Sequence, residues 1–156
     1  MGKTIVMRAL ETKGILYTYR QHIRRQYTAE GVAEELGVPL AWVTKAMIVQ
    51  RSNGEFALVV IPGDKQLSLR KVAEALGDKD VVLASERDVQ RVTGFRVGAV
   101  SVVGFRRKDI AGYIDQGVLE LEKVIISSGR PDAGLELAPQ DLLRAIEGVQ
   151  VGDFAV

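Results

Sequence analysis

The chain has 156 residues, a formal net charge of +1 and no cysteine. This length is enough for one domain with a substantial core, because a domain of this size buries roughly 68–70% of its unfolded surface. The absence of cysteine excludes disulfides, thiol nucleophiles and thiolate metal sites, and it fits a reducing cytoplasm. A net charge near zero attracts a polyanion only weakly, so a local patch would have to hold a nucleic-acid partner.

Nothing in the sequence divides the chain or directs it to a membrane. There is no internal repeat, low-complexity tract or linker. The N-terminus lacks the apolar core of a signal peptide, and no apolar stretch approaches the ~20 residues that span a bilayer. We therefore expect one cytoplasmic domain over residues 1–156, with no membrane partner.

Short helices and short strands follow one another along the chain. Apolar spacing and a closing glycine predict helices over residues 4–13, 29–36, 69–76 and 86–92, and a last helix is predicted over residues 140–147. Strands are predicted over residues 15–19, 42–51, 55–61, 81–83, 112–115 and 123–127. The turn Ser52-Asn53-Gly54 joins the second and third strands in a hairpin, and residues 95–112 form mainly loop. Without a regular β-α-β alternation, this order favours an α+β fold with a mixed sheet.

Lys45 is the only charge in the apolar run from Trp42 to Val49. On a period of two it shares a face with Val43 and Met47. Lysine is almost never fully buried unless a group pairs with it. Either the stem lies on apolar surface while the ammonium reaches water, or the ammonium binds an anionic partner.

Several familiar kinds of site are disfavoured. His22 is the sole histidine, and its polar flanks predict a solvated loop rather than a catalytic base. One histidine, no cysteine and no close carboxylate cluster argue against a transition-metal site. The glycines form neither a phosphate-binding P-loop nor a dinucleotide fingerprint, so we expect no cofactor.

Two glycine-containing segments could approach a ligand with their backbone. Residues 94–104 carry three spaced glycines and lead into Arg106, Arg107 and Lys108. Residues 127–130 follow an apolar strand. Exposed amides in such segments can form an anion site, although turns between strands explain them equally well. Asp115 ends another apolar strand and could orient Lys45 or simply cap the strand.

Ten short segments occur in a characteristic order over essentially the whole chain. They are Tyr17-Thr18-Tyr19, Thr28-Ala29-Glu30, Leu36-Gly37-Val38, the strand around Lys45, residues 59–67, residues 91–95, residues 97–101 with Gly104, Ile114-Asp115, Ser127-Ser128-Gly129-Arg130, and residues 135–142. As an ordered set they resemble the YbaK family of aminoacyl-tRNA deacylases. That family is related to the editing domain inserted in bacterial prolyl-tRNA synthetases.

The resemblance implies a YbaK-like fold, with short helices around a strongly curved mixed sheet. It implies that Lys45 holds the terminal phosphate or the ester region of the acylated tRNA end. Gly98, Ser101 and Gly104 would shape an oxyanion or water site. The implied pocket lining is Tyr19, Thr44, Asp115, Ser128 and Gly129, and the candidate contacts to the tRNA backbone are Arg106, Arg107 and Lys108.

No side-chain nucleophile is obligatory in the family, so the resemblance implies hydrolysis assisted by a substrate thiol or by the ribose 2′-hydroxyl. An aminoacyl ester is already activated, and positioning with electrostatic stabilisation can supply much of the acceleration. The family usually has a proline after the position of Ser101, where this chain has Val102. Proline would fix the backbone and remove a donor, so Val102 leaves this loop less constrained.

Together these features predict a trans-editing aminoacyl-tRNA deacylase. Its partner would be a tRNA acceptor end carrying a small amino acid, with Ala- or Cys-tRNA(Pro) as leading candidates, and prolyl-tRNA synthetase is a candidate partner. One methylene is worth only ~1–3 kcal/mol, so the sequence does not decide between alanine and cysteine. Two alternatives stay open: a non-catalytic module that binds tRNA or a synthetase through the same pocket, and a sensor of small carboxylates or phosphates.

Overall fold

The computed structural model describes residues 2–156, which form two β-sheets. The smaller sheet is antiparallel, with the strand order β1 (Thr18–Gln21), β7 (Ala133–Leu137) and β6 (Val124–Ser127). The larger sheet has the order β4 (Val82–Leu83), β2 (Lys45–Gln50), β3 (Phe56–Ile61), β5 (Ala111–Asp115) and β8 (Gln150–Gly152). It is mixed, because β4, β2 and β3 are antiparallel neighbours whereas β3, β5 and β8 run parallel.

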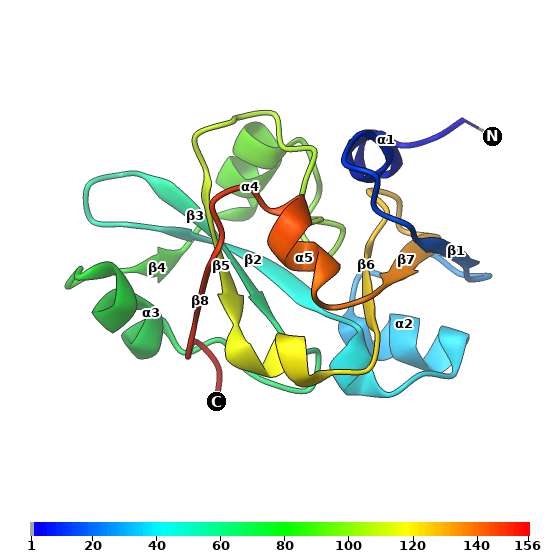
Figure 1. Cartoon of the computed structure of the whole chain (residues 1–156). Coiled ribbons are helices and arrows are strands. Elements are labelled where there is room, and N and C mark those ends of the chain that lie inside the picture. Colours follow the sequence, from blue (N-terminus) through cyan, green and yellow to red (C-terminus); the bar gives the residue numbers. More distant parts are fainter. Residues whose placement is uncertain (1) are drawn as a thin grey trace.

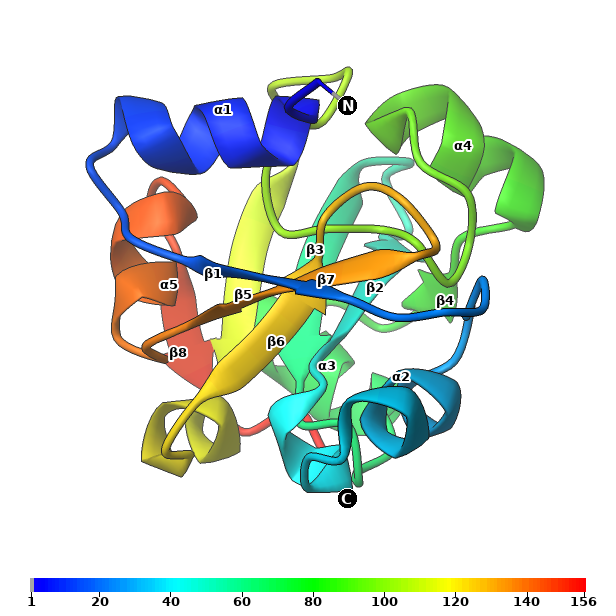
Figure 2. The same ribbon diagram turned by 90° about the vertical axis from the view of Figure 1, so that its right-hand side faces the viewer.

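Short helices surround the sheets (Figure 1). The α-helices are α1 (Ile5–Thr12), α2 (Ala29–Leu36), α3 (Leu69–Leu76), α4 (Glu86–Thr93) and α5 (Asp141–Ala145), and two 3₁₀ helices are η1 (Leu40–Trp42) and η2 (Gln116–Glu120). Figure 2 shows the smaller sheet lying across the strands of the larger one, with α1 and α2 at opposite ends of that layer. The predicted α+β fold with a mixed sheet is confirmed.

The two sheets are joined at the start of β2. Val43 forms an isolated parallel bridge with Ile125 of β6, and the amide of Thr44 donates to the Ile125 carbonyl at 3.1 Å. Beyond this bridge β2 continues in the larger sheet while β6 continues in the smaller one. The curvature expected of one sheet therefore takes the form of two sheets that separate at a single junction.

The main core fills the space between the sheets. Apolar side chains of both sheets meet there, among them Leu58 and Ile114 from the larger sheet and Ile126 and Leu135 from the smaller one. Strand β3 is buried along its whole length because a second cluster, around Val72 of α3, covers its other face. Burial on both faces explains why this strand has a continuous apolar sequence.

Local capping explains where the helices lie. The hydroxyls of Thr28, Ser68 and Ser85 each accept a hydrogen bond from the amide three residues later, at the first turns of α2, α3 and α4. Gly37 and Gly77 end α2 and α3 in the left-handed conformation, which glycine adopts without steric cost. These helices were predicted from the same signals, and the structure confirms them.

Three predicted elements have other boundaries in the structure, and two strands were not predicted. The strand expected over residues 42–51 begins at Lys45, because Leu40–Trp42 forms a 3₁₀ turn. The strand expected over residues 15–19 is displaced to Thr18–Gln21, and the last helix is limited to Asp141–Ala145. Strands β7 and β8 were missed, because Gly134 and Glu136 interrupt the apolar pattern of β7 and β8 has only three residues.

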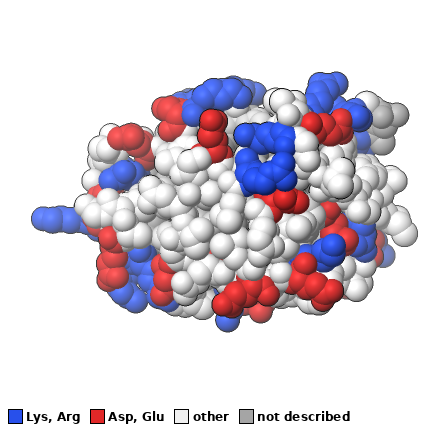
Figure 3. Space-filling view, viewed as in Figure 1, with Lys and Arg blue, Asp and Glu red and all other residues white. Residues whose placement is uncertain are grey.

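The surface carries charges of both signs. Figure 3 shows basic and acidic side chains interspersed around a broad uncharged area on the face seen in Figure 1. This distribution agrees with the small net charge of +1. Among the described residues, no helix is both long and apolar enough to cross a bilayer.

Candidate active site

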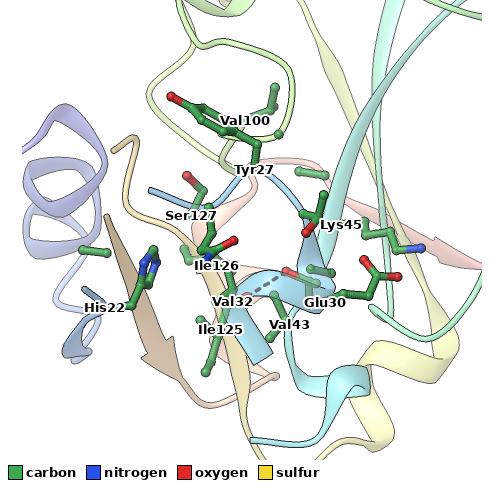
Figure 4. Close-up of a pocket in the computed structure, with 18 of the residues that line it drawn as sticks. His22, Tyr27, Glu30, Val32, Val43, Lys45, Val100, Ile125, Ile126 and Ser127 are labelled. Carbon is green, nitrogen blue, oxygen red and sulfur yellow. Dashed lines mark hydrogen bonds between the residues drawn. The ribbon is translucent and has the colours of Figure 1, made fainter. Parts of the chain in front are cut away.

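A pocket of about 320 Å³ lies at the junction where the two sheets separate. Its walls come from the start of β2, the facing parts of β6 and β7, the first turn of α2, and two loops over residues 22–28 and 97–100. In Figure 4, Tyr27 and Ile125 lie at opposite ends of the pocket, with His22 on one side and Lys45 on the other. The pocket exists because β2 and β6 share one bridge and then separate.

Lys45 is the charged residue that the start of β2 contributes to the pocket. It is half-buried and lines the pocket, and its Nζ donates to the Lys65 carbonyl at 2.7 Å. An ammonium has three donors, so this bond leaves two for a ligand or water. Lys45 forms no ion pair with any carboxylate among residues 2–156. Lys45 therefore packs its stem against the pocket wall and still has an ammonium that can bind a ligand.

A close backbone approach places the Lys65 carbonyl beneath Lys45. Gly63 follows β3, and its amide donates to the Ala41 carbonyl at 3.2 Å. A Cβ at this position would lie 2.1 Å from the Val43 carbonyl oxygen, so only glycine lets this turn pack against the segment before β2. The turn holds the acceptor that orients the lysine.

Gly98 joins the two loops above the pocket. Its φ is +88°, and a Cβ would lie 2.4 Å from the carbonyl oxygen of Tyr27. Both the conformation and the contact require glycine. Gly98 lines the pocket, and it sets how closely the loops over residues 22–28 and 97–100 approach.

Two serines fasten the glycine-rich loop to β6. The Ser101 hydroxyl donates to the Ser127 carbonyl at 2.6 Å, and the Ser127 hydroxyl donates to the Ala99 carbonyl at 2.8 Å. Ser101 is fully buried and lies behind the pocket, whereas Ser127 lines it. Ser101 is therefore placed to position the loop.

Three consecutive backbone amides of this loop are unengaged. Those of residues 100–102 donate to no other group among the described residues. Val100 lines the pocket, so its amide is a candidate donor to an anion there. Val102 is buried in the main core with 3% exposure, and its N–H donates no hydrogen bond to any group within residues 2–156.

His22 is buried, contrary to the prediction from the sequence. Its flanks predicted a solvated loop, yet the side chain is only 5% exposed and lines the pocket. Nδ1 lies 2.7 Å from the Arg24 carbonyl, which can only accept, so Nδ1 carries a proton. No serine or threonine hydroxyl within residues 2–156 is hydrogen-bonded to this ring, and so it does not form a nucleophile–base pair.

An ion pair stiffens the turn between β6 and β7. Arg130 lines the pocket and binds Asp132 through two bonds, Nε to Oδ1 at 3.0 Å and Nη2 to Oδ2 at 2.8 Å. This guanidinium holds the pKa of Asp132 below its usual range. The Ser128 hydroxyl is fully buried in the same turn and donates to the Ala133 carbonyl at 2.7 Å.

Other predicted site residues are used elsewhere. Asp115 is 5% exposed and accepts from the amides of Phe154 at 2.8 Å and Gly117 at 3.0 Å, so it caps η2 and fixes the C-terminal segment. Tyr19 is 40% exposed on β1 and does not line the pocket. Gly129, at φ +93°, packs against the Phe95 ring behind it.

The predicted tRNA contacts lie at a second, more open hollow. Gly104, Arg107 and Lys108 line it together with α1 and the segment after α5. Arg107 is already bound by Asp109 through Nε at 2.9 Å and through Nη2 at 2.5 Å, and Arg106 is exposed. Of the predicted residues, the structure thus brings together Lys45, Thr44 and Gly98 in the first pocket.

Sequence reasoning missed much of the pocket wall. The missed residues share an apolar or small side chain or lie in the loop before α2, and the main ones are His22, Gln26, Tyr27, Val43, Ile125, Ile126, Ser127, Ala133 and Gly134. No single-sequence pattern distinguishes these from ordinary core and loop positions. No three acidic or histidine side chains within residues 2–156 gather in a group that could hold a metal ion.

Fold and pocket together define an α+β protein with a lysine at the opening of a small apolar cavity between two separating sheets. A family model described as the aminoacyl-tRNA editing domain matches residues 24–145, and the chain belongs to that family. The matched segment contains Lys45, the glycine-rich loop and every residue that lines the pocket apart from His22.

Relatives include both separate proteins and parts of synthetases. A protein of Enterococcus faecalis, provisionally named as the Cys-tRNA(Pro)/Cys-tRNA(Cys) deacylase EbsC, is 29% identical over 148 residues, which are 94% of this chain and 90% of that protein. The proline–tRNA ligase of Fervidobacterium nodosum is 31% identical over 109 residues, which are 69% of this chain but only 18% of the ligase.

Solved structures share the whole fold. The crystal structure of a hypothetical protein superposes with a TM-score of 0.91 at 31% identity, covering 98% of this chain and 100% of that one. That of a protein provisionally described as a trans-editing enzyme for prolyl-tRNA synthetase gives a TM-score of 0.87 at 27% identity, over 97% and 95% of the two chains.

Proposed function

We propose that this chain is a trans-acting aminoacyl-tRNA deacylase that hydrolyses the ester between a small amino acid and the terminal ribose of a mischarged tRNA. The observation that carries the proposal is Lys45, which lines the pocket and whose ammonium has one backbone acceptor and forms no ion pair with a carboxylate among residues 2–156. A phosphate or a developing oxyanion suits this position, because a partly withdrawn lysine attracts it more strongly than a fully solvated one.

The pocket walls suit a small acyl group. Val43, Ile125 and Ile126 give an apolar interior, and Ala133 and Gly134 add little bulk. Lys45 lies at the side of this space, so an aminoacyl ester with its side chain inside would present its ribose and phosphate toward the lysine (Figure 4). The amino acid fills the cavity while the RNA stays outside.

The reaction needs no protein nucleophile. Water adds to the ester carbonyl carbon, the bond between that carbon and the ribose oxygen breaks, and the ribose oxygen takes a proton, giving a free amino acid and an intact tRNA end. The ribose 2′-hydroxyl or a substrate thiol assists the proton transfer. Lys45 and the unengaged amide of Val100 stabilise negative charge on the reacting oxygen.

Two relatives support a link with proline decoding. The Enterococcus faecalis protein is provisionally named for Cys-tRNA(Pro), and the ligase match places a related segment inside a prolyl-tRNA synthetase. We propose Ala- or Cys-tRNA(Pro) as the substrate and prolyl-tRNA synthetase as a partner that delivers it.

The test is deacylation of Ala-, Cys- and Pro-tRNA(Pro) by the purified protein. The proposal predicts hydrolysis of at least one of the first two well above the spontaneous rate, while Pro-tRNA(Pro) is spared. If none is hydrolysed faster than in buffer, the enzymatic proposal fails. Binding of uncharged tRNA(Pro) at low and moderate salt then separates a non-catalytic tRNA module from a small-molecule sensor.

A further inference from the structure

Beside the pocket, an arginine lies over a tyrosine and has no acidic partner within residues 2–156. The Arg96 guanidinium carbon lies 5.2 Å from the centroid of the Tyr27 ring, and Nη1 lies 3.4 Å from the Tyr27 hydroxyl. The two residues come from different loops, which Gly98 holds together at the Tyr27 carbonyl. Arg96 is exposed and Tyr27 is half-buried, so the pair faces solvent.

Elsewhere in residues 2–156, two other arginines lie over an aromatic ring, and each of them has a carboxylate partner. Arg91 and Arg107 both lie over Phe56, at 5.8 Å and 5.6 Å from the ring centroid. Asp88 binds Arg91 and Asp109 binds Arg107, so both of those charges are compensated within the protein. Among the arginine–aromatic pairs of residues 2–156, only that of Arg96 lacks a carboxylate.

The position of the pair relates it to the pocket. Tyr27, Val97 and Gly98 line the pocket, and Figure 4 shows Tyr27 at one end of it with Lys45 to its side. A ligand whose phosphate or ester reaches Lys45 therefore extends past Tyr27 as it leaves the cavity. Val97 is 47% exposed and adds apolar surface at this point.

Such a surface matches a nucleobase. Unpaired bases stack on aromatic rings and on guanidinium planes, and every base offers a π face. The uncompensated charge of Arg96 also attracts the phosphate next to the base. A peptide or a small carboxylate would use the charge but would not need the ring.

We propose that Tyr27 and Arg96 form a stacking site for the terminal base of an RNA 3′ end, next to the pocket that takes the amino acid. This inference rests on the proposed function, because the base is that of the nucleotide whose ester is hydrolysed. It assigns three parts of one ligand: the acyl group inside the cavity, the ribose and phosphate at Lys45, and the base at Tyr27 and Arg96.

The test compares ligands with and without a base. Adenosine 5′-monophosphate and ribose 5-phosphate are titrated into the wild type and into Tyr27→Ala, Tyr27→Phe, Arg96→Ala and Arg91→Ala, with binding followed by amide chemical shifts. KM and kcat for deacylation of Ala-tRNA(Pro) and Cys-tRNA(Pro) are measured on the same proteins. Arg91→Ala is the matched control, since it removes an arginine over an aromatic ring whose charge is compensated by Asp88.

The wild type is expected to bind the nucleotide more tightly than the ribose phosphate. Tyr27→Ala should remove this preference and raise KM by roughly 5- to 150-fold, the loss typical of one stacked base. Arg96→Ala should raise KM as well. Tyr27→Phe keeps the ring and should retain the nucleotide preference that Tyr27→Ala loses, whereas Arg91→Ala should behave like the wild type. Circular dichroism checks that each variant is folded. If Tyr27→Ala does not fold, the KM of Arg96→Ala still tests the proposal.

The outcomes separate the two proposals. Equal binding of nucleotide and ribose phosphate by the wild type, or an unchanged KM in folded Tyr27→Ala and Arg96→Ala, would overturn the stacking site while leaving the deacylase intact. A nucleotide preference that depends on Tyr27 in a protein that deacylates no tRNA would support the stacking site and remove the proposed reaction.

Discussion

Lys45 lays its stem on apolar surface and also keeps its ammonium available to an anionic ligand, the two alternatives that the sequence left open. The period-two pattern predicted its face of the strand, and the sheet confirms this, because Val49 packs against the cluster beneath α3 while Ile48 packs between the sheets. The sequence could not show the Lys65 carbonyl, since that contact depends on the turn after β3. The single charge in an apolar strand predicted that Lys45 has a functional role. The pocket beside it is formed by segments that are distant in the sequence, so the sequence could not show it.

Val102 is expected to tolerate proline. Its N–H has no acceptor within residues 2–156 and its φ is not positive, so Val102→Pro removes no hydrogen bond. We expect deacylation within about twofold of the wild type, because the substitution removes no hydrogen bond and changes no side chain that lines the first pocket. Steady-state kinetics and thermal melting check this.

Val59→Pro is the contrasting variant. Val59 lies in the central strand β3, between β2 and β5, where proline removes a ladder hydrogen bond, so this variant should be destabilised. A tenfold loss of activity in folded Val102→Pro would show that the valine amide takes part in the reaction.

At the scale of elements, helices were predictable and the site was not. Caps and closing glycines predicted α2, α3 and α4 because these signals are local. Strand β7 was missed because Gly134 interrupts its apolar pattern, and a Cβ there would lie only 2.6 Å from the Ile125 side chain. Asp115, a plausible pocket residue in sequence, caps η2 and holds the Phe154 amide instead.

The contact between the two loops above the pocket gives a prediction for Gly98. Gly98→Ala places a Cβ against the Tyr27 backbone and requires a left-handed alanine, so we expect both a lower melting temperature and a loss of deacylation. Gly37→Ala is the matched control, because its φ is +66° but no described residue lies within 4 Å of the added Cβ. It should lose about 1–2 kcal/mol of stability and keep its activity. Equal effects of the two substitutions on activity would contradict this role of Gly98.

Asp78 ties the turn of the β2–β3 hairpin to the end of α3 and gives a pH prediction. The Ser52 hydroxyl donates to its carboxylate at 2.6 Å and the Ser52 amide at 3.1 Å, and these bonds hold the pKa of Asp78 well below its ordinary value. The folded state thus favours the charged form. Its contribution to stability is fully present above the ordinary carboxyl pKa of about 3.9 and is lost as the pH falls below it.

Urea unfolding of the wild type and Asp78→Asn between pH 2 and 7 measures this contribution. The variant should be less stable near neutral pH, and the difference should shrink below about pH 4. Asp64→Asn, at an exposed position in the turn after β3, is the control. A stability difference that stays constant down to pH 2 would contradict the assignment.

At the scale of the whole molecule, charge alone does not identify the partner. The net charge is +1, and Figure 3 shows both signs interspersed, so binding of tRNA must depend on a few local contacts. Arg25 is exposed in the loop over residues 22–28 and has no ion-pair partner within residues 2–156. Arg107, in contrast, is bound by Asp109.

Arg25→Ala should therefore reduce the slope of log K for tRNA(Pro) binding against log salt by about 0.7–0.9, the value of one phosphate contact. Arg107→Ala should leave the slope unchanged. Fluorescence anisotropy from 50 to 300 mM salt measures both slopes, and the opposite ranking would place the RNA at the second hollow.

The most direct test of the account is single-turnover deacylation of Ala- and Cys-tRNA(Pro) by the wild type, Lys45→Ala and Lys65→Ala. Lys65→Ala removes a neighbouring positive charge but keeps the carbonyl that Lys45 binds. Loss of a charged hydrogen bond to the substrate should lower the rate of Lys45→Ala by roughly 10- to 100-fold, whereas Lys65→Ala should stay close to the wild type. Equal rates for the wild type and Lys45→Ala would contradict the account.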